Sequence, residues 1–147
     1  MQTIEQSRAA YALQCIEEVN RAKKDVAQEY KSYARQWGPM VHANGLGQAL
    51  AFARSKPKSE AWKKLYQHLS NWLTGHTVAQ NMACPAPLRV SATTTDAIVA
   101  ITTQPTEAYL AATSEALALV LWIKRLAEAS IEDAPPPAQA GAVQVEV

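Results

Sequence analysis

Apolar residues recur at three- and four-residue steps through most of the chain before residue 131, which is the period of an amphipathic α-helix. The first such run covers residues 3–37 without interruption. Thr3 and Gln6 form a T-x-x-Q capping box at its start, and Gly38-Pro39 is the expected stop signal. The pattern therefore predicts one long N-terminal helix of roughly 34 residues, about 50 Å at 1.5 Å per residue.

Four shorter helical segments follow. Residues 39–55 form a helical pattern that Asn44-Gly45-Leu46-Gly47 interrupts, and the two glycines indicate either a turn or a close approach of another helix. Ser59 is a good N-cap and Gly75 a good C-cap for the next segment. A short helix is predicted over residues 96–103, starting at Thr94 or Thr95, and a long one from Pro105 to about residue 131.

The centre of this last segment is apolar almost all round, so we predict that it is the core helix and that Trp122 packs in the core against the first helix. The helical spacing favours core positions for the tryptophans, and Trp37, at the end of the first helix, is the candidate exception that could stack on a base. Residues 76–93 lack a period and are predicted to be a long loop. Residues 132–147 are predicted to be a flexible, Pro/Ala-rich, acidic tail.

These elements predict the fold class: an all-α protein, with residues 1–131 forming a single compact bundle of about five helices, a long N-terminal helix and a disordered C-terminal tail. Two widely spaced cysteines give no disulfide framework, which favours a reducing, cytoplasmic location. The longest apolar run, residues 116–123, is far below the ~20 residues of a bilayer span. We therefore expect no membrane partner.

Candidate catalytic chemistry is sparse. The three histidines, His42, His68 and His76, form no HxH, HxxxH or HExxH motif, so we predict neither a metal site nor a cofactor. Cys15 lies on the apolar side of the first helix and is predicted to be a buried packing residue. The sequence predicts a protein without a catalytic site. One alternative stays open, a small helical ribonuclease that uses His42 and His68 as an acid–base pair.

A basic cluster is the strongest positive signal. Five Lys and Arg side chains lie within residues 54–64, opposed by Glu60, in a chain whose net charge is only +1. Cations beside a connector between helices can contact neighbouring phosphates. Lys31 and Arg35, one turn apart on the first helix, could extend the cluster. The predicted nucleic-acid-binding residues are Lys31, Arg35, Arg54, Lys56, Lys58, Lys63 and Lys64. The alternative is a protein-only helical adaptor with a solvated basic surface.

Several motifs carry a family resemblance. The block N-G-L-G-Q-A-L-A-F at residues 44–52 is the most specific, and residues 8–12, 30–35, 109–117 and 121–127 support it. The chain resembles the small subunit of the type III-B CRISPR (Cmr) effector complex over residues 1–131. The resemblance implies an all-helical, non-catalytic subunit in antiviral defence.

In that family several copies form the minor filament beside the backbone subunits that hold the CRISPR RNA, and they help to accommodate target RNA. Target cleavage belongs to a backbone subunit. The partners that the resemblance implies are the CRISPR RNA–target RNA, other Cmr-type subunits and copies of the chain itself. The resemblance supplies no RNA-contact motif, so the predicted binding residues rest on charge alone.

Overall fold

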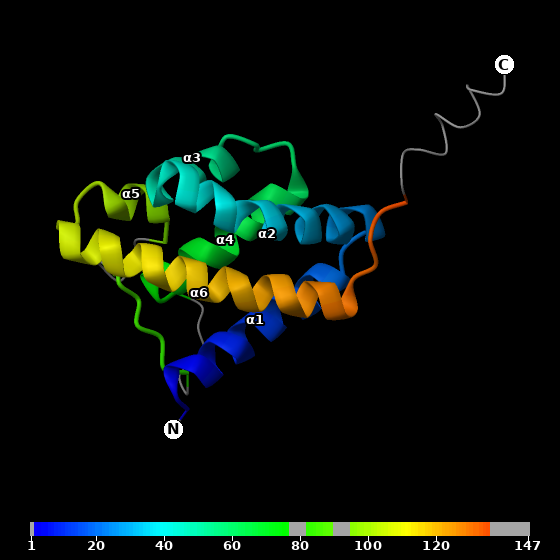
Figure 1. The fold of residues 1–147 in the computed structure, drawn as a ribbon, viewed down its shortest axis with the longest axis horizontal. Coiled ribbons are helices and arrows are strands. Elements are labelled where there is room, and N and C mark those ends of the chain that lie inside the picture. Colours follow the sequence, from blue (N-terminus) through cyan, green and yellow to red (C-terminus); the bar gives the residue numbers. More distant parts are fainter. Residues whose placement is uncertain (1, 77–81, 90–94, 136–147) are drawn as a thin grey trace, which may run out of the picture.

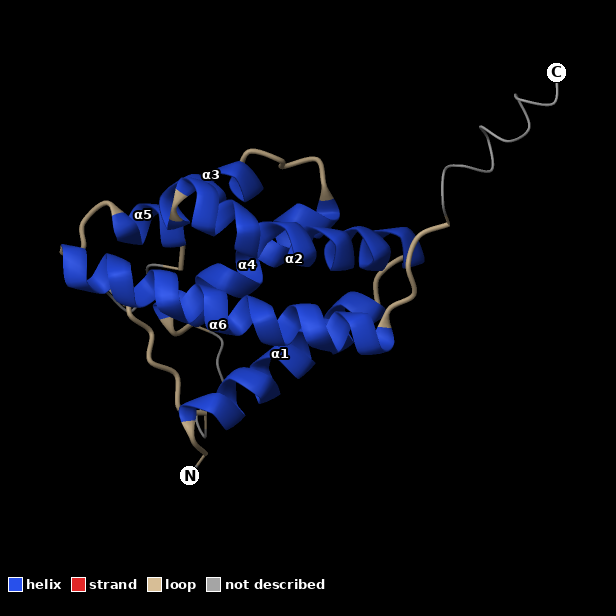
Figure 2. Ribbon diagram, viewed as in Figure 1, coloured by secondary structure: helices blue, strands red, loops and turns tan. Residues whose placement is uncertain are grey.

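A computed structural model describes residues 2–76, 82–89 and 95–135 of the chain. These ranges contain six α-helices and no strand (Figures 1 and 2), which confirms the predicted all-α class. The helices are α1 (Ile4–Asn20), α2 (Lys24–Asn44), α3 (Leu46–Arg54), α4 (Glu60–Thr74), α5 (Ala97–Ile101) and α6 (Thr106–Ser130).

Helix α6 organises the bundle. It packs against α1, α2 and α4, while α2 also packs against α3 and α4 (Figure 1). The apolar faces of these helices meet in one continuous core. The largest fully buried side chains are Trp37, Trp72, Tyr30, Ile16, Leu46, Leu50, Leu65, Leu69, Leu73, Leu88, Leu119 and Ile123.

The prediction of one uninterrupted N-terminal helix is wrong. The capping box at Thr3 begins α1 as expected, but α1 ends at Asn20. The amides of Arg21 and Ala22 close its last turn on the carbonyls of Glu18 and Val19, at 3.2 and 3.0 Å. The chain re-enters a helix only at Lys24, so α1 and α2 are two helices that pack in different directions around α6 (Figure 1).

The predicted stop at Gly38-Pro39 is also wrong, because α2 continues through Pro39 to Asn44. The turn falls instead at Gly45, whose φ of 88° lies in the region that favours glycine. Gly47 provides the close approach to another helix that the sequence left open as the alternative to a turn. Its amide donates to the Tyr109 hydroxyl at 2.9 Å, and an added Cβ would lie 3.3 Å from that oxygen.

The helices with clear terminal signals are confirmed. Ser59 accepts a hydrogen bond from the Trp62 amide at 3.2 Å at the start of α4, and Gly75 ends α4 with a φ of 80°. Pro105 precedes α6. Helix α5 is shorter than predicted and is capped by Asp96 rather than by Thr94 or Thr95. Thr94 lies outside the described residues.

Two tryptophans exchange their predicted places. Trp37 is fully buried, and its indole N–H donates to the Ala49 carbonyl at 3.1 Å. Trp122 is only half-buried at the edge of the core, and its indole N–H donates to the Glu5 carboxylate at 2.9 Å. Trp37 is therefore not the exception to core packing, and the prediction that Trp122 is a core residue is wrong. The continuation of α2 past Gly38 explains the burial of Trp37, because this residue lies in the middle of a helix and not at its end.

The predicted loop and tail lie partly outside the described residues, which exclude 77–81, 90–94 and 136–147. Residues 82–89 are non-helical and pack onto α4, since Leu88 is fully buried and its amide donates to the Leu73 carbonyl at 2.9 Å. Cys15 is buried, as predicted.

Candidate nucleic-acid interface

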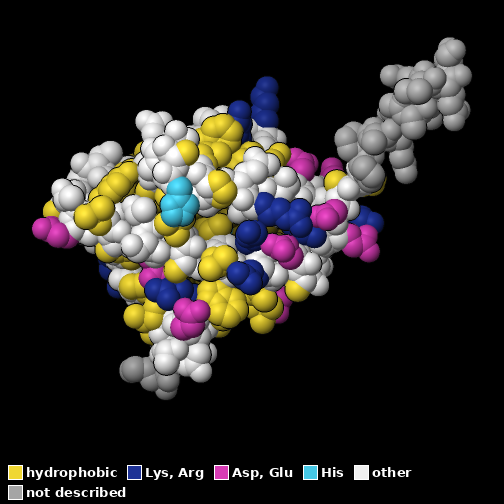
Figure 3. All heavy atoms as spheres, viewed as in Figure 1, with side chains coloured by type: hydrophobic (Ala, Val, Ile, Leu, Met, Phe, Trp, Pro, Cys, Tyr) yellow, Lys and Arg dark blue, Asp and Glu magenta, His cyan; other side chains and the backbone are white. Residues whose placement is uncertain are grey.

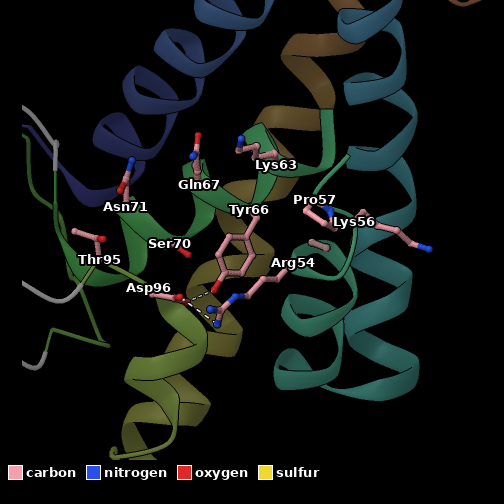
Figure 4. Close-up of a pocket in the computed structure, with 11 residues that line it drawn as sticks. Arg54, Lys56, Pro57, Lys63, Tyr66, Gln67, Ser70, Asn71, Thr95 and Asp96 are labelled. Carbon is pink, nitrogen blue, oxygen red and sulfur yellow. Dashed lines mark hydrogen bonds and ion pairs between the residues drawn. The ribbon is translucent and has the colours of Figure 1, made fainter. Parts of the chain in front are cut away.

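A groove of about 520 Å³ lies where the predicted basic cluster meets the start of α5. Its walls are the end of α3, the connector to α4, one face of α4 and the residues just before α5 (Figure 4). The lining residues are Ala53, Arg54, Lys56, Pro57, Lys63, Tyr66, Gln67, Ser70, Asn71, Thr95 and Asp96.

Asp96 fixes one wall of this groove. Its carboxylate accepts hydrogen bonds from the Tyr66 hydroxyl and, at 3.1 Å, from the Ile98 amide at the start of α5. It also forms an ion pair with the Arg54 guanidinium at 3.1 Å. Burial and the hydrogen bond to Asp96 raise the pKa of Tyr66 to about 12, so its hydroxyl stays protonated and donates at neutral pH. Arg54 is thus held in a defined orientation across the groove.

Three predicted lysines present their charge to solvent around the connector. Lys56, Lys58 and Lys63 are exposed, and within the described residues none of them forms an ion pair. The Lys56 ammonium lies 4.9 Å from the centre of the Phe52 ring, a cation–π contact. Lys56 and Lys63 line the groove and Lys58 stands beside it on the connector. The one carboxylate of the lining, Asp96, is balanced by Arg54.

Lys64 lies outside this groove. It is half-buried on α4, and its charge acts on Glu18 and His68 across the α1–α4 contact. The sequence cluster is therefore divided by helix geometry, because consecutive residues of a helix point in different directions.

Lys31 and Arg35 do not extend the cluster. The Lys31 side chain is buried, and its ammonium donates to the Ile131 carbonyl at 2.5 Å and pairs with Asp133 at 3.1 Å. Arg35 pairs with the same carboxylate at 3.1 Å. Both cations therefore anchor the chain segment after α6 to α2. On the face shown in Figure 3, Lys and Arg side chains near this end of the molecule stand beside Asp and Glu and form no uniformly basic patch.

The two histidines of the ribonuclease alternative are not brought together. His68 is buried on α4; its Nδ1 meets the Tyr30 hydroxyl at 2.8 Å, and its Nε2 contacts the Glu18 carboxylate. Burial lowers the pKa of His68, which favours the neutral ring that donates to Glu18 and accepts from Tyr30. His42 is exposed on α2 and lines a different hollow, between α2 and α6. His68 lines a separate hollow, with Cys15 and Glu18.

The groove contains residues that the sequence did not single out. Tyr66 and Asp96 connect elements that are 30 residues apart, and charge patterning shows neither. Gln67 and Asn71 were detectable, since they follow the predicted Lys63 at four-residue steps in one row on the polar face of α4. Over the described residues no group of three His, Cys, Asp or Glu side chains could hold a metal ion, and no helix is long and apolar enough to cross a membrane.

Fold and groove together define a small all-helical protein with a basic surface groove between α3, α4 and α5. The family model of the CRISPR-associated protein Cas_Cmr5 matches residues 4–130, and the chain belongs to this family. It is therefore a subunit of the Cmr complex, and its partners include other subunits of that complex.

A solved structure supports this assignment. The chain is similar to a CRISPR-associated Cmr5 family protein from Thermus thermophilus, with 31% sequence identity and a TM-score of 0.69. The match covers 90% of this chain and 100% of the Thermus chain, so the shared fold includes nearly the whole bundle. The resemblance read from the N-G-L-G-Q-A-L-A-F block is confirmed.

Proposed function

We propose that this Cmr subunit is non-catalytic and binds RNA through the groove between α3, α4 and α5. Several copies along the complex, forming its minor filament, then hold target RNA in place. The observation that carries the proposal is the exposed charge of Lys56, Lys58 and Lys63 around a groove whose single carboxylate is already paired.

The charge arrangement suits phosphates without favouring a sequence. Flexible ammonium groups on an exposed connector can follow a backbone, and Arg54 adds a fixed guanidinium at the groove wall. Each phosphate contact releases counterions, so affinity falls with salt, with a slope of log K against log[salt] of about −0.7 per contact for a single strand. A single copy has few contacts and binds weakly. Repetition of the groove along a filament multiplies the effect.

The test is a triple variant, Lys56→Ala, Lys58→Ala and Lys63→Ala, incorporated into the assembled complex. All three side chains are exposed, so each substitution should change stability by less than about 0.5 kcal/mol. We expect a complex of normal composition that binds target RNA less tightly. The slope of log K against log[salt] should be shallower by about 2 for each copy of the subunit that contacts the RNA.

The matched control removes the same charge elsewhere: Lys23→Ala, Lys24→Ala and Arg125→Ala, which lie at the α1–α2 turn and on α6, away from the groove. This control should retain target affinity and slope. If both triple variants bind target RNA as the unmodified complex does, the lysines are bystanders and the chain is a protein-only adaptor. If only the groove variant fails to assemble, the groove is a contact between subunits.

A further inference from the structure

The groove has a second row of polar groups beside its cations. Gln67 and Asn71 follow Lys63 at four-residue steps on α4, so the three side chains stand on successive turns along one edge of the groove (Figure 4). Neither amide forms a side-chain hydrogen bond within the described residues. Each amide therefore offers a donor and an acceptor to whatever enters.

The rest of the lining is mixed: Ala53 and Pro57 are apolar, whereas Ser70, Thr95 and Asp96 are polar. Ala53 and Pro57 stand at the α3 side, and the Tyr66 ring lies between the α4 edge and Arg54 (Figure 4). The Tyr66 hydroxyl is bonded to Asp96 and to the Ile98 amide, at 3.2 Å for the latter, so the ring is held in place. A concave surface that offers both an aromatic ring and unbonded polar groups can hold a small ligand, and a volume of about 520 Å³ lies within the usual range of roughly 300–1,000 Å³.

From this lining we infer that the groove holds one nucleotide of a single RNA strand, with its base against the amides of Gln67 and Asn71 and its flanking phosphates at Lys56 and Lys63. This inference rests on the proposed function and names the form of RNA that the site takes. A paired base turns its hydrogen-bonding edge to the opposite strand and cannot enter a concave groove, whereas an unpaired base can do so. Amides can meet the edge of any base, so the site is tolerant of sequence.

The inference separates two kinds of contact that can be measured independently. Cations contribute affinity that depends on salt and is the same with or without a base, while the amides contribute affinity that requires a base to be present and hardly depends on salt. An abasic strand has the same phosphates as an ordinary strand but no bases. The ratio of the two affinities therefore isolates what the groove gains from the base.

The experiment measures binding of the full chain to a short single-stranded RNA and to an abasic strand of equal length, by fluorescence anisotropy over a series of low salt concentrations. We expect the base-bearing strand to bind about 3- to 10-fold more tightly, the range of one net hydrogen bond of ordinary strength. The double variant Gln67→Ala and Asn71→Ala should bring this ratio close to one. Its affinity for the abasic strand and its salt slope should not change.

The matched control is Asn44→Ala and Gln48→Ala, an exposed pair of amides that lines a different hollow, beside Phe52. This pair should keep the ratio of the unmodified chain. Equal binding of both strands to the unmodified chain, or an unchanged ratio in the Gln67 and Asn71 variant, overturns the nucleotide site and leaves the proposed phosphate contacts intact. Failure of both strands to bind at low salt overturns RNA binding by the groove itself.

Discussion

Replacement of Glu115 by Ala should be among the most damaging single changes in the bundle. Glu115 lies on α6 with only 6% of its surface exposed. Its carboxylate accepts two hydrogen bonds from the Arg8 guanidinium of α1, at 2.6 and 2.9 Å, and one from the Trp72 indole of α4, at 3.0 Å. One side chain therefore joins three helices. The same pairing raises the pKa of Arg8, so the guanidinium is charged at neutral pH.

The expected loss of stability follows from the hydrogen bonds that Trp72 and Arg8 lose. The Trp72 indole N–H is fully buried and would have no acceptor, which costs about 1–3 kcal/mol. The Arg8 side chain is 22% exposed, so water can recover part of its solvation. Removal of one member of a buried pair costs ~3–5 kcal/mol, and the partial exposure of Arg8 places Glu115→Ala near the lower limit, at about 3 kcal/mol. The melting temperature should fall by about 6–12 °C.

Urea denaturation followed by circular dichroism measures this loss directly. Glu115→Gln retains a side-chain oxygen for Trp72 and should lose less than Glu115→Ala. Glu128→Ala, on an exposed position of the same helix, is the control and should change stability by less than about 0.5 kcal/mol. A loss below about 1 kcal/mol for Glu115→Ala would show that the three-helix network is not formed in solution.

Two further predictions concern buried aromatic rings. Trp37→Ala should lower the free energy of unfolding by about 3–5 kcal/mol because it leaves a closed cavity. Trp122→Ala should lower it clearly less because Trp122 is half-buried. If urea denaturation gave the reverse order, Trp122 would be the core residue, as the sequence predicted. Burial lowers the pKa of His68, so the unfolded chain takes up the proton first as the pH falls. The contribution of His68 to stability should therefore be complete above pH ~6.5 and decline below it, and His68→Gln should make the melting temperature less dependent on pH below about 6.5.

Local signals account for the parts of the fold that the sequence predicted. Ser59 and Gly75 are a cap and a stop in the ordinary sense, and they lie at the two ends of α4 in the structure. Gly38-Pro39 also has the sequence of a helix stop, but the prediction from it is wrong because Pro39 lies inside α2. The burial of Trp37 and Val41, which flank Pro39 in α2, outweighs the loss of one backbone hydrogen bond. Tertiary contacts of this kind have no trace in the local pattern.

The candidate nucleic-acid interface shows the same difference between local signals and tertiary contacts. Arg54, Lys56 and Lys63 are close in sequence, and their clustering alone predicted that they would share a surface. Asp96, which orients Arg54, comes from the start of α5 and is visible only after α4 and α5 have packed. Lys31 illustrates the opposite error. Its burial depends on Ile131 and Asp133, some 100 residues away, and an isolated helical stripe does not distinguish it from a solvated lysine.

The break between α1 and α2 can be tested by the sign of a stability change. Lys23 is the N-cap of α2 with φ −61° and ψ 149°, and its side chain makes no capping bond. A serine there could accept a hydrogen bond from the first turn, so Lys23→Ser should stabilise the protein by about 0.5–1 kcal/mol. The gain is at the lower end of the capping range because Asp25 already accepts from the Val26 amide at 2.9 Å.

Lys24→Ser is the matched control, one residue further along and inside the helix. At this first helical position serine cannot act as the N-cap, so the capping gain is absent and stability should change by no more than a few tenths of a kcal/mol. In a continuous helix over residues 3–37 both positions would be interior and both serines would destabilise. A gain in stability for Lys23→Ser that Lys24→Ser lacks, measured by urea denaturation, therefore establishes the break, and a loss in both variants would restore the single long helix.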